Sequence, residues 1–270
     1  HPPFEAVEAD EMIWGRGAVD MKNMVAMSAM VMKLLARHPE IPRHRDLIFA
    51  AVADEEEGCA FGSSWLVDHH AERVRAEYML GEVGGFWLNI GARTYIPTLV
   101  AEKGRVHMKL RASGPPGHGS IPHEESALAR LARAVARLEE RRLPYHLTPV
   151  VEGFIRKLAA SQPPLTSAGM LGMLNERVAP VVLERLLPER DQARSFHAML
   201  HNTATPTIMH AGGKLNVIPR EATCELDGRS LPGQTAHDLA REVRDVIADA
   251  GVEVEVLSAS PPVVADPVEG

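Results

Sequence analysis

The sequence predicts an α/β protein in which the first hundred residues differ in texture from the rest. Two short, continuous apolar runs, residues 46–53 and 76–81, are each followed by acidic residues, and such runs are typical of strands covered on both faces of a parallel sheet. From about residue 100 apolar and polar side chains alternate instead, as in residues 105–112, which is typical of antiparallel strands with one open face. The 270 residues therefore predict an α/β part followed by an α+β part.

The first part begins with loop and turn residues up to about residue 20. Residues 21–37 are Met, Val, Ala and Leu on nearly every side, which predicts a helix that is buried all round. The run 46–53 then predicts a central strand, residues 61–70 a second helix, and the run 76–81 another strand. This order of helix and strand favours an open α/β sheet.

The second part is predicted to be an α+β domain whose antiparallel sheet keeps one face open. Its strands show a period of two and its helices a period of 3.6. The predicted elements, in order, are a strand at 105–112, a loop at 114–122, a helix at 126–142, helices interrupted by proline at 143–200, a strand at 222–229, a helix at about 235–250 and a strand at 252–257.

The composition indicates an ordinary globular protein with an acidic balance. Lys and Arg number 29 and Asp and Glu 36, so the formal charge is −7, which argues against non-specific binding to nucleic acid. Cys59 and Cys224 are the only cysteines in the sequence, so neither a disulfide framework nor a thiolate zinc site is expected. No apolar stretch approaches the roughly 20 residues that cross a bilayer, and we expect a cytoplasmic protein without a membrane segment.

Acidic residues cluster where the predicted strands end. The acidic segment 54–58 follows the first apolar run, Glu82 follows the second, and Asp20 precedes the first helix. Ligands collect at the carboxyl ends of strands in an open α/β sheet, and neighbouring carboxylates repel each other unless a cation neutralises them. These positions therefore point to one oxygen-rich divalent cation site. The alternatives are a solvated acidic turn at 54–58 and a helix cap at Asp20.

Five motifs follow one another along the chain. They are WGRGAVDMK at 14–22, DEEEG at 54–58, GHGSIP at 117–122, NVIP at 216–219 and DGRSLPG at 227–233. In this order the sequence resembles the dinuclear zinc amidohydrolases and exopeptidases, the family of aminoacylase, acetylornithine deacetylase, succinyl-diaminopimelate desuccinylase and carboxypeptidase G. The resemblance implies a zinc-exopeptidase-like catalytic domain with a mostly parallel sheet, here incomplete, and an inserted α+β lid and dimerisation domain with an antiparallel sheet.

For the first part, the resemblance implies a metal site and a general base. Asp20 matches the carboxylate that bridges two zinc ions, Glu56 a ligand of one ion and Glu82 a ligand of the other. Glu55 matches the general base, which takes a proton from the attacking water. The implied cofactor is two zinc ions per subunit, with cobalt or manganese as possible substitutes. Glu57 is interpreted as a solvated neighbour.

For the second part, the resemblance implies a lid that completes the site. His118 matches a histidine that, in family dimers, reaches the partner's active site and stabilises the oxyanion. Asn216 and Arg229 match positions that hold the substrate, and Arg229 is a candidate for binding its carboxylate. Two alternatives stay open, namely His118 as an ordinary exposed residue and Arg229 as a partner of Asp227 or Glu225 on its own strand.

The predicted domain order is 1–100 as part of the metal-binding catalytic domain, 101–262 as the lid and 263–270 as the start of a return to the catalytic domain. The family's first metal motif, a His-x-Asp, and its last zinc-ligand histidine have no match in this sequence. We therefore expect the sequence to be an internal portion of a longer chain.

The expected function is metal-dependent hydrolysis of the amide bond of N-acyl amino acids or small peptides by a homodimer, with Glu55 as the base. A second hypothesis is a non-catalytic, dimerising relative, because two metal-ligand histidines are unmatched. A third, a magnesium site for phosphoryl transfer, lacks the Gly-rich phosphate loop with Lys that such chemistry uses.

Overall fold

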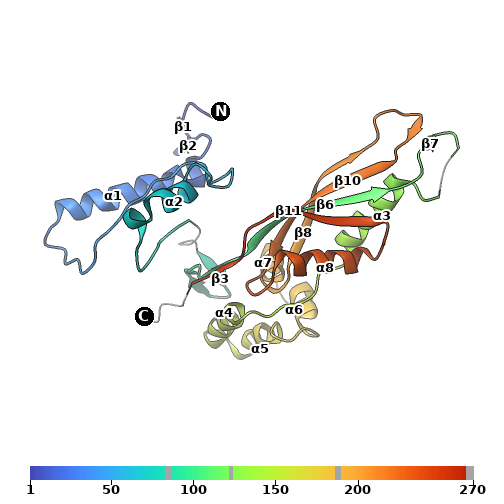
Figure 1. Cartoon of the computed structure of the whole chain (residues 1–270). Helices are drawn as coiled ribbons and strands as arrows, with labels where there is room; N and C mark the ends of the chain where they lie inside the picture. Colours follow the sequence, from blue (N-terminus) through green and yellow to red (C-terminus); the bar gives the residue numbers. More distant parts are fainter. Residues whose placement is uncertain (83–86, 122–123, 186–189, 266–270) are drawn as a thin grey trace. The chain divides into compact units, whose positions relative to one another are not determined.

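The computed structural model describes residues 1–82, 87–121, 124–185 and 190–265 (Figure 1). The chain divides into two compact units, His1–Gly85 and Phe86–Gly270, which are described one at a time. The predicted domain boundary after residue 100 lies inside the second unit, and the roles assigned to the domains stay predictions. Of the predicted return segment 263–270, residues 266–270 lie outside the described residues.

The first unit contains a short antiparallel ribbon and two helices. Its elements are β1 (Val7–Ala9), β2 (Met12–Trp14), the π-helical turn η1 (Ala18–Lys22), α1 (Asn23–Arg37) and α2 (Ser63–Val74). Both predicted helices are confirmed. Each begins two residues later than the sequence predicts, α1 because the η1 turn precedes it and α2 because a tight loop leads into it.

In the first unit, two predicted strands are wrong, and so is the prediction that the first helix is buried. Residues 46–53 and 76–81 form no strand and are exposed, and α1 has no buried residue, so that Met24, Met27 and Met30 face solvent. A central strand needs a hydrogen-bonded neighbour along each edge, but the described residues of this unit hold only the β1–β2 ribbon. The mostly parallel sheet is therefore not observed, and α1 has no sheet to pack on.

The second unit is built on a four-stranded antiparallel sheet. Its strands are β6 (Gly104–Ser113), β8 (Thr203–Ala211), β10 (Glu221–Ser230) and β11 (Val252–Ala259), in the spatial order β11-β6-β10-β8. Three of them confirm predicted strands. The sequence does not predict β8, because Pro206 interrupts its alternation, and proline is compatible with a strand at the edge of a sheet.

Alternation along the strands divides this sheet into a buried face and an open face. Val106, Met108 and Leu110 are buried beneath the helices α3 (Ala127–Glu140) and α8 (Ala236–Ile247), which cover that face (Figure 1). The intervening residues of β6, His107 and Lys109 among them, lie on the other face. The predicted antiparallel sheet with one open face is thus observed in the second unit.

A cluster of four helices forms a second core in this unit. The helices are α4 (Pro149–Ala160), α5 (Pro164–Gly172), α6 (Ala179–Arg185) and α7 (Arg190–Leu200), and they confirm the predicted interrupted helices of 143–200. Ile155, Met173 and Leu200 are fully buried there. The remaining strands pair as short ribbons, namely β3 (Leu88–Ile90) with β4 (Arg93–Tyr95), β5 (Ala101–Glu102) with β12 (Val263–Val264), and β7 (Gly117–His118) with β9 (Val217–Ile218).

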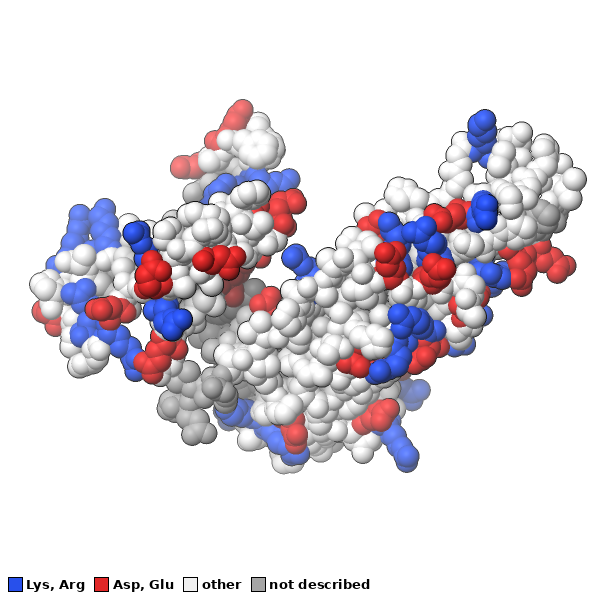
Figure 2. All heavy atoms as spheres, viewed as in Figure 1, with Lys and Arg blue, Asp and Glu red and all other residues white. Residues whose placement is uncertain are grey.

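Charges of both signs are mixed over the visible surface of each unit. Figure 2 shows Lys and Arg side chains interspersed with Asp and Glu, without a large surface of one sign in this view. This pattern agrees with the net charge of −7 and offers no basic stripe for nucleic acid. Among the helices that the structure describes, none is both long and apolar enough to span a bilayer.

Two stacked histidines close the helical cluster at the end of α7. The rings of His197 and His201 lie 4.0 Å apart, centre to centre, and Nδ1 of His201 lies 2.9 Å from the carbonyl oxygen of His197. Burial, helped by the charges of His201, Arg142 and Lys103, lowers the pKa of His197 to about 4. Burial also lowers the pKa of His201. Both rings are therefore neutral near pH 7.

The neutral histidines predict a pH dependence of stability. In an unfolded chain histidine takes up a proton near pH 6.5, whereas His197 resists protonation down to about pH 4. Stability is therefore complete above pH 6.5 and falls as the pH drops toward 4. We expect the free energy of unfolding to be about 1 kcal/mol lower at pH 5 than at pH 7, allowing for partial solvent exposure.

The measurement is urea unfolding of the native protein and of His197→Gln at both pH values. The variant should lose a clear part of the difference, with the rest due to His201. An equal pH dependence in both proteins would contradict this assignment.

Candidate functional site

The acidic segment 54–58 forms a tight turn that leads into α2. Backbone bonds close it, from the N–H of Cys59 to the carbonyl oxygen of Asp54 (2.6 Å) and from the N–H of Gly58 to that of Glu55 (3.1 Å). The Asp54 carboxylate accepts the N–H of Phe61 at 2.8 Å. Asp54 thus holds the turn together. The three glutamates that follow it, Glu55, Glu56 and Glu57, extend from the turn and are exposed.

A glycine fixes how this turn meets the chain before it. A Cβ on Gly62 would lie 1.8 Å from the carbonyl oxygen of Ala53, which is far inside any permitted contact. The turn can therefore close only with glycine at this position.

Asp20 lies in the turn that precedes α1. Gly17 has φ 71°, and the N–H of Lys22 donates to its carbonyl oxygen at 2.8 Å. The peptide bond between Asp20 and Met21 is cis. Helix α1 has Lys22 at its N-cap and no side-chain cap, so the alternative of Asp20 as the helix cap is wrong.

Glu82 lies close enough to the other predicted acidic residues for their charges to affect its carboxyl group. A hydrogen bond with Asp20 is the largest cause of a raised pKa at the Glu82 carboxyl, and partial burial and the negative charges of Asp20, Glu55 and Glu56 add to it. Negative charges close to a carboxyl group disfavour its ionised form and so raise its pKa. The structure therefore gathers into one acidic cluster the four residues for which the sequence predicts metal and base roles.

This acidic cluster fits only part of a metal site. Its donors are all carboxylate oxygens, which suit a divalent cation, but zinc sites usually include histidine. Among the described residues no three His, Cys, Asp or Glu side chains converge closely enough to hold a metal ion. The ligand roles of Asp20, Glu56 and Glu82 and the base role of Glu55 stay predictions.

In the second unit, His118 on β7 and Asn216, the residue just before β9, lie close together at one end of the sheet. Ribbon β7–β9 pairs His118 with Val217, and the N–H of Gly119 donates to the carbonyl oxygen of Asn216 at 2.9 Å. The His118 ring is exposed, with Nδ1 2.7 Å from the Ser120 hydroxyl. The two predicted residues are therefore brought together. Pro122, the last residue of their motif, lies outside the described residues.

Arg229 lies at the opposite end of the same sheet. It lies eight positions along β10 from Glu221, which is about 27 Å of strand. Its guanidinium group donates two hydrogen bonds to Asp227, at 2.9 and 3.1 Å. The alternative pairing with Asp227 is thus observed, and within one chain Arg229 is not brought together with His118 and Asn216.

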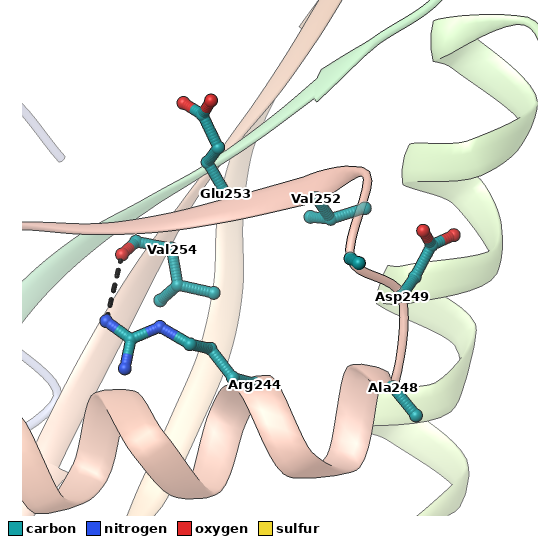
Figure 3. A pocket seen from close by; sticks show the side chains of 7 residues that line it. Arg244, Ala248, Asp249, Val252, Glu253 and Val254 are labelled. Carbon is teal, nitrogen blue, oxygen red and sulfur yellow. Dashed lines mark hydrogen bonds between the residues drawn. The ribbon is translucent and has the colours of Figure 1, made fainter.

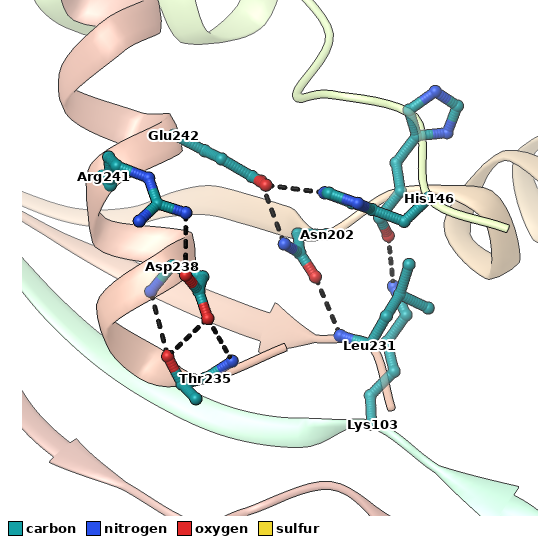
Figure 4. Close-up of polar contacts among 9 residues, drawn as sticks. Lys103, His146, Asn202, Leu231, Thr235, Asp238, Arg241 and Glu242 are labelled. Carbon is teal, nitrogen blue, oxygen red and sulfur yellow. Dashed lines mark hydrogen bonds and ion pairs between the residues drawn. The ribbon is translucent and has the colours of Figure 1, made fainter. Parts of the chain in front are cut away.

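A buried polar network, which the sequence did not predict, secures the strand end after Arg229 (Figure 4). Asn202, 1% exposed, accepts the N–H of Leu231 at 2.8 Å and donates to Glu242 at 2.9 Å. Glu242, 5% exposed, also lies 2.6 Å from Nε2 of His146. A lone Asn or Glu in a sequence carries no sign of burial, so no sequence signal could have found these residues.

Next to this network α8 begins with a capping box. The Thr235 hydroxyl accepts the N–H of Asp238, and the Asp238 carboxylate accepts the N–H of Thr235 (Figure 4). Hydrogen bonds from Thr235, with a further one from Arg241, lower the pKa of Asp238 to about 2. The cap fixes the start of α8, which carries Glu242 toward the strand end.

The two hollows found in the second unit contain none of the predicted site residues. One, of about 500 Å³, lies at the turn between α8 and β11 and includes Arg244, Asp249 and Glu253 (Figure 3). The other, of about 450 Å³, lies beside Arg93 and Gln162. The candidate site is therefore defined by the acidic cluster and the sheet ends, not by an enclosed cavity.

Comparison with known proteins identifies the family of this chain. The chain matches peptidase family M20/M25/M40 over residues 1–267, and it belongs to that family. The zinc metallopeptidase and amidohydrolase resemblance drawn from the motifs is thereby confirmed.

Named relatives agree with this assignment. The chain is 30% identical over 275 residues to the human N-fatty-acyl-amino acid synthase/hydrolase PM20D1, covering 98% of this chain and 52% of that protein. It is also 30% identical over 275 residues to the probable carboxypeptidase S-like 2 of Dictyostelium discoideum, covering 96% of this chain and 49% of that one. The chain thus spans about half the length of the curated relatives it matches.

A solved structure supports the fold. Human carnosine dipeptidase 1 aligns with a TM-score of 0.53 at 17% identity, over 98% of this chain and 58% of that one. At this identity the likeness shows the fold alone, which is an M20 peptidase fold of mixed helices and antiparallel sheets.

The buried network predicts that Asn202 is important for stability. In Asn202→Ala the Leu231 N–H and one Glu242 oxygen lose their buried partner, so we expect the free energy of unfolding to fall by about 2–3 kcal/mol. Asn175→Ala is the matched control, because Asn175 accepts one bond from the exposed backbone of Arg177, and it should lose less than about 1 kcal/mol. Urea unfolding measures both, and equal losses would contradict the prediction.

Proposed function

We propose that this chain supplies acidic catalytic residues and a lid to a metal-dependent hydrolase that cleaves the amide bond of N-acyl amino acids or small peptides. The observation that carries the proposal is the acidic cluster, in which a hydrogen bond with Asp20 and the negative charges of Asp20, Glu55 and Glu56 raise the pKa of Glu82. Such a concentration of carboxylates is costly unless a cation neutralises it. The names of two relatives, an N-fatty-acyl-amino acid synthase/hydrolase and a probable carboxypeptidase, support this substrate class.

Within the acidic cluster the residues divide into ligands and a base. Asp20, Glu56 and Glu82 would hold zinc, with two ions as the proposed number, together with ligands that this sequence does not supply. A divalent metal there would provide the Lewis acidity that polarises an amide carbonyl and acidifies water. Glu55 extends from the same turn as Glu56 and would take the proton of the attacking water and pass it to the leaving nitrogen.

The lid residues would act on the two ends of the scissile group. His118, exposed at the tip of the sheet, would donate a hydrogen bond to the oxyanion as the carbonyl is attacked, and Asn216 beside it would hold the acyl side. Arg229 would bind the substrate carboxylate. About 27 Å of strand separates the sheet end near His118 and Asn216 from the end that carries Arg229. We therefore propose that a homodimer combines His118 of one subunit with the acidic cluster of the other.

The second candidate is a non-catalytic, dimerising relative. It is favoured by the finding that no three potential ligands converge among the described residues. The divalent-metal content of the native protein separates the two, because bound zinc, cobalt or manganese excludes a degenerate site and the absence of any bound metal excludes metal-dependent catalysis by this protein.

The assignment of Glu55 as the base is tested by Glu55→Gln. This change keeps the shape of the side chain and removes proton transfer, so kcat for hydrolysis of an N-acyl amino acid by the zinc- or cobalt-loaded native protein should fall by a factor of about 10²–10⁴, with metal content unchanged. Glu57→Gln is the matched control on the same turn and should keep kcat within about twofold. Equal losses in both variants would remove Glu55 from this role.

The homodimer is tested by mixing two inactive variants. Glu55→Gln lacks the base and His118→Ala lacks the oxyanion donor, so each alone should be nearly inactive. If His118 acts across the interface, subunit exchange creates hybrids with one intact site, and activity should return to about a quarter of the wild-type value, since half of the dimers are hybrids with one good site of two. No recovery despite exchange would show that His118 acts within its own subunit or not at all.

A further inference from the structure

Near one end of the β6–β10 pairing, two open-face pairs include an acidic residue and the last pair does not. On the open face, Glu225 is opposite Lys109 and Asp227 is opposite His107, and opposite charges across neighbouring strands are stabilising. The last pair is Arg229 opposite Arg105. Like charges directly opposite each other are destabilising, so this pair differs from its two open-face neighbours, each of which includes an acidic residue.

Lys103 adds a third cation at this end. It immediately precedes Gly104, the register partner of Ser230, and so lies one step beyond the Arg105–Arg229 pair. A Cβ on Gly104 would lie 2.7 Å from the Ser230 hydroxyl oxygen and 2.5 Å from the carbonyl oxygen of Ser260. Glycine at 104 therefore lets the chain approach closely enough to place Lys103 beside the end of β10.

Within the part of the chain that the structure describes, the ammonium group of Lys103 has no acidic partner. It donates to the carbonyl oxygen of His201 at 2.9 Å (Figure 4), which uses one of its three donors. Among the described residues no carboxylate forms an ion pair with Lys103 or Arg105, and Arg229 pairs only with Asp227. Three cations and one carboxylate leave a local excess of two positive charges.

The environment of Lys103 adds to this electrostatic imbalance. Burial and the nearby charge of Arg229 lower the pKa of Lys103 to about 8. The groups around it are Arg229 and Arg105 on the strands and His197 and His201 at the end of α7. None of them supplies negative charge. A partly buried ammonium group without a counter-ion is costly, and an anion would relieve that cost.

We propose that Lys103 is a specificity-determining residue that binds the carboxylate of the substrate together with Arg229. The inference rests on the proposed function, because that function supplies a ligand with a free carboxylate. The Lys103 ammonium has two donors left for such a group, and Arg229 can use the guanidinium nitrogen that does not face Asp227. The buried network at Asn202 holds the strand end on which Arg229 and Leu231 lie, so it positions this pair of cations.

The test compares two ligands that differ only in the carboxylate, N-acetyl-L-leucine and N-acetyl-L-leucinamide. Binding to the metal-free native protein is followed by NMR titration into the millimolar range. We expect the wild-type protein to prefer the acid by about tenfold or more. Lys103→Met should reduce the affinity for the acid about tenfold and leave that for the amide unchanged.

Two further variants make the result specific. Lys157→Met removes a Lys from the exposed surface of α4 and should change neither affinity. Lys103→Arg keeps the positive charge and should keep the preference for the acid. In the wild-type protein the affinity for the acid should also fall as the pH rises past 8, where Lys103 loses its proton, and Lys103→Arg should lack this fall.

Two outcomes overturn the proposal. One is a wild-type protein without a preference for the acid, and the other is a folded Lys103→Met protein that keeps the wild-type ratio of the two affinities. The titration needs neither metal nor turnover, so it is read independently of hydrolysis. A protein that binds the acid through Lys103 and yet hydrolyses no amide would refute the proposed function and leave the carboxylate site standing.

Discussion

The pairing of β10 on both of its edges is the constraint on which the second unit depends. All ten residues of β10 pair with β6, and its other edge pairs with β8. Because side chains alternate along a paired strand, one register decides that Leu226 enters the core and that Arg229 lies on the open face. A shift of one residue would exchange the two faces. The core and the predicted substrate residue are therefore fixed by the same hydrogen bonds.

Each unit carries charge that its own side chains do not balance. In the first unit neighbouring carboxylates raise the pKa of Glu82. In the second, Arg229 pairs with Asp227, and among the described residues no carboxylate forms an ion pair with Lys103 or Arg105. A bound cation would stabilise the carboxylates of the first unit, and a bound anion would stabilise the cations of the second. An amide substrate with a free carboxylate, hydrolysed with the help of a metal, presents both kinds of partner, which is why the two observations support a single function.

The sequence predicts the elements of the second unit well, because its signals are local. The alternation at 105–112 and the helical spacing at 126–142 predict their elements whichever other elements pack against them. The runs 46–53 and 76–81 do not, because the same apolar residues form a central strand only when other strands lie beside them. The order of the motifs predicts the roles of Glu55 and Asp20, and in the structure both residues raise the pKa of Glu82. Asn202 and Lys103 have no motif, because their importance comes from burial and from the chain that faces them.

The Arg105–Arg229 pair at the end of the β6–β10 pairing is informative because its two open-face neighbours, Lys109–Glu225 and His107–Asp227, each include an acidic residue. A protein could satisfy Arg105 and Lys103 with an acidic residue on either strand, as Glu225 satisfies Lys109 and His107 a few residues away. Local departures from such rules, in a fold that otherwise obeys them, tend to coincide with functional sites. An acidic residue here would stabilise the sheet and fill the place of a ligand carboxylate. The absence of such a partner from the described residues is therefore what a site for an anionic substrate requires.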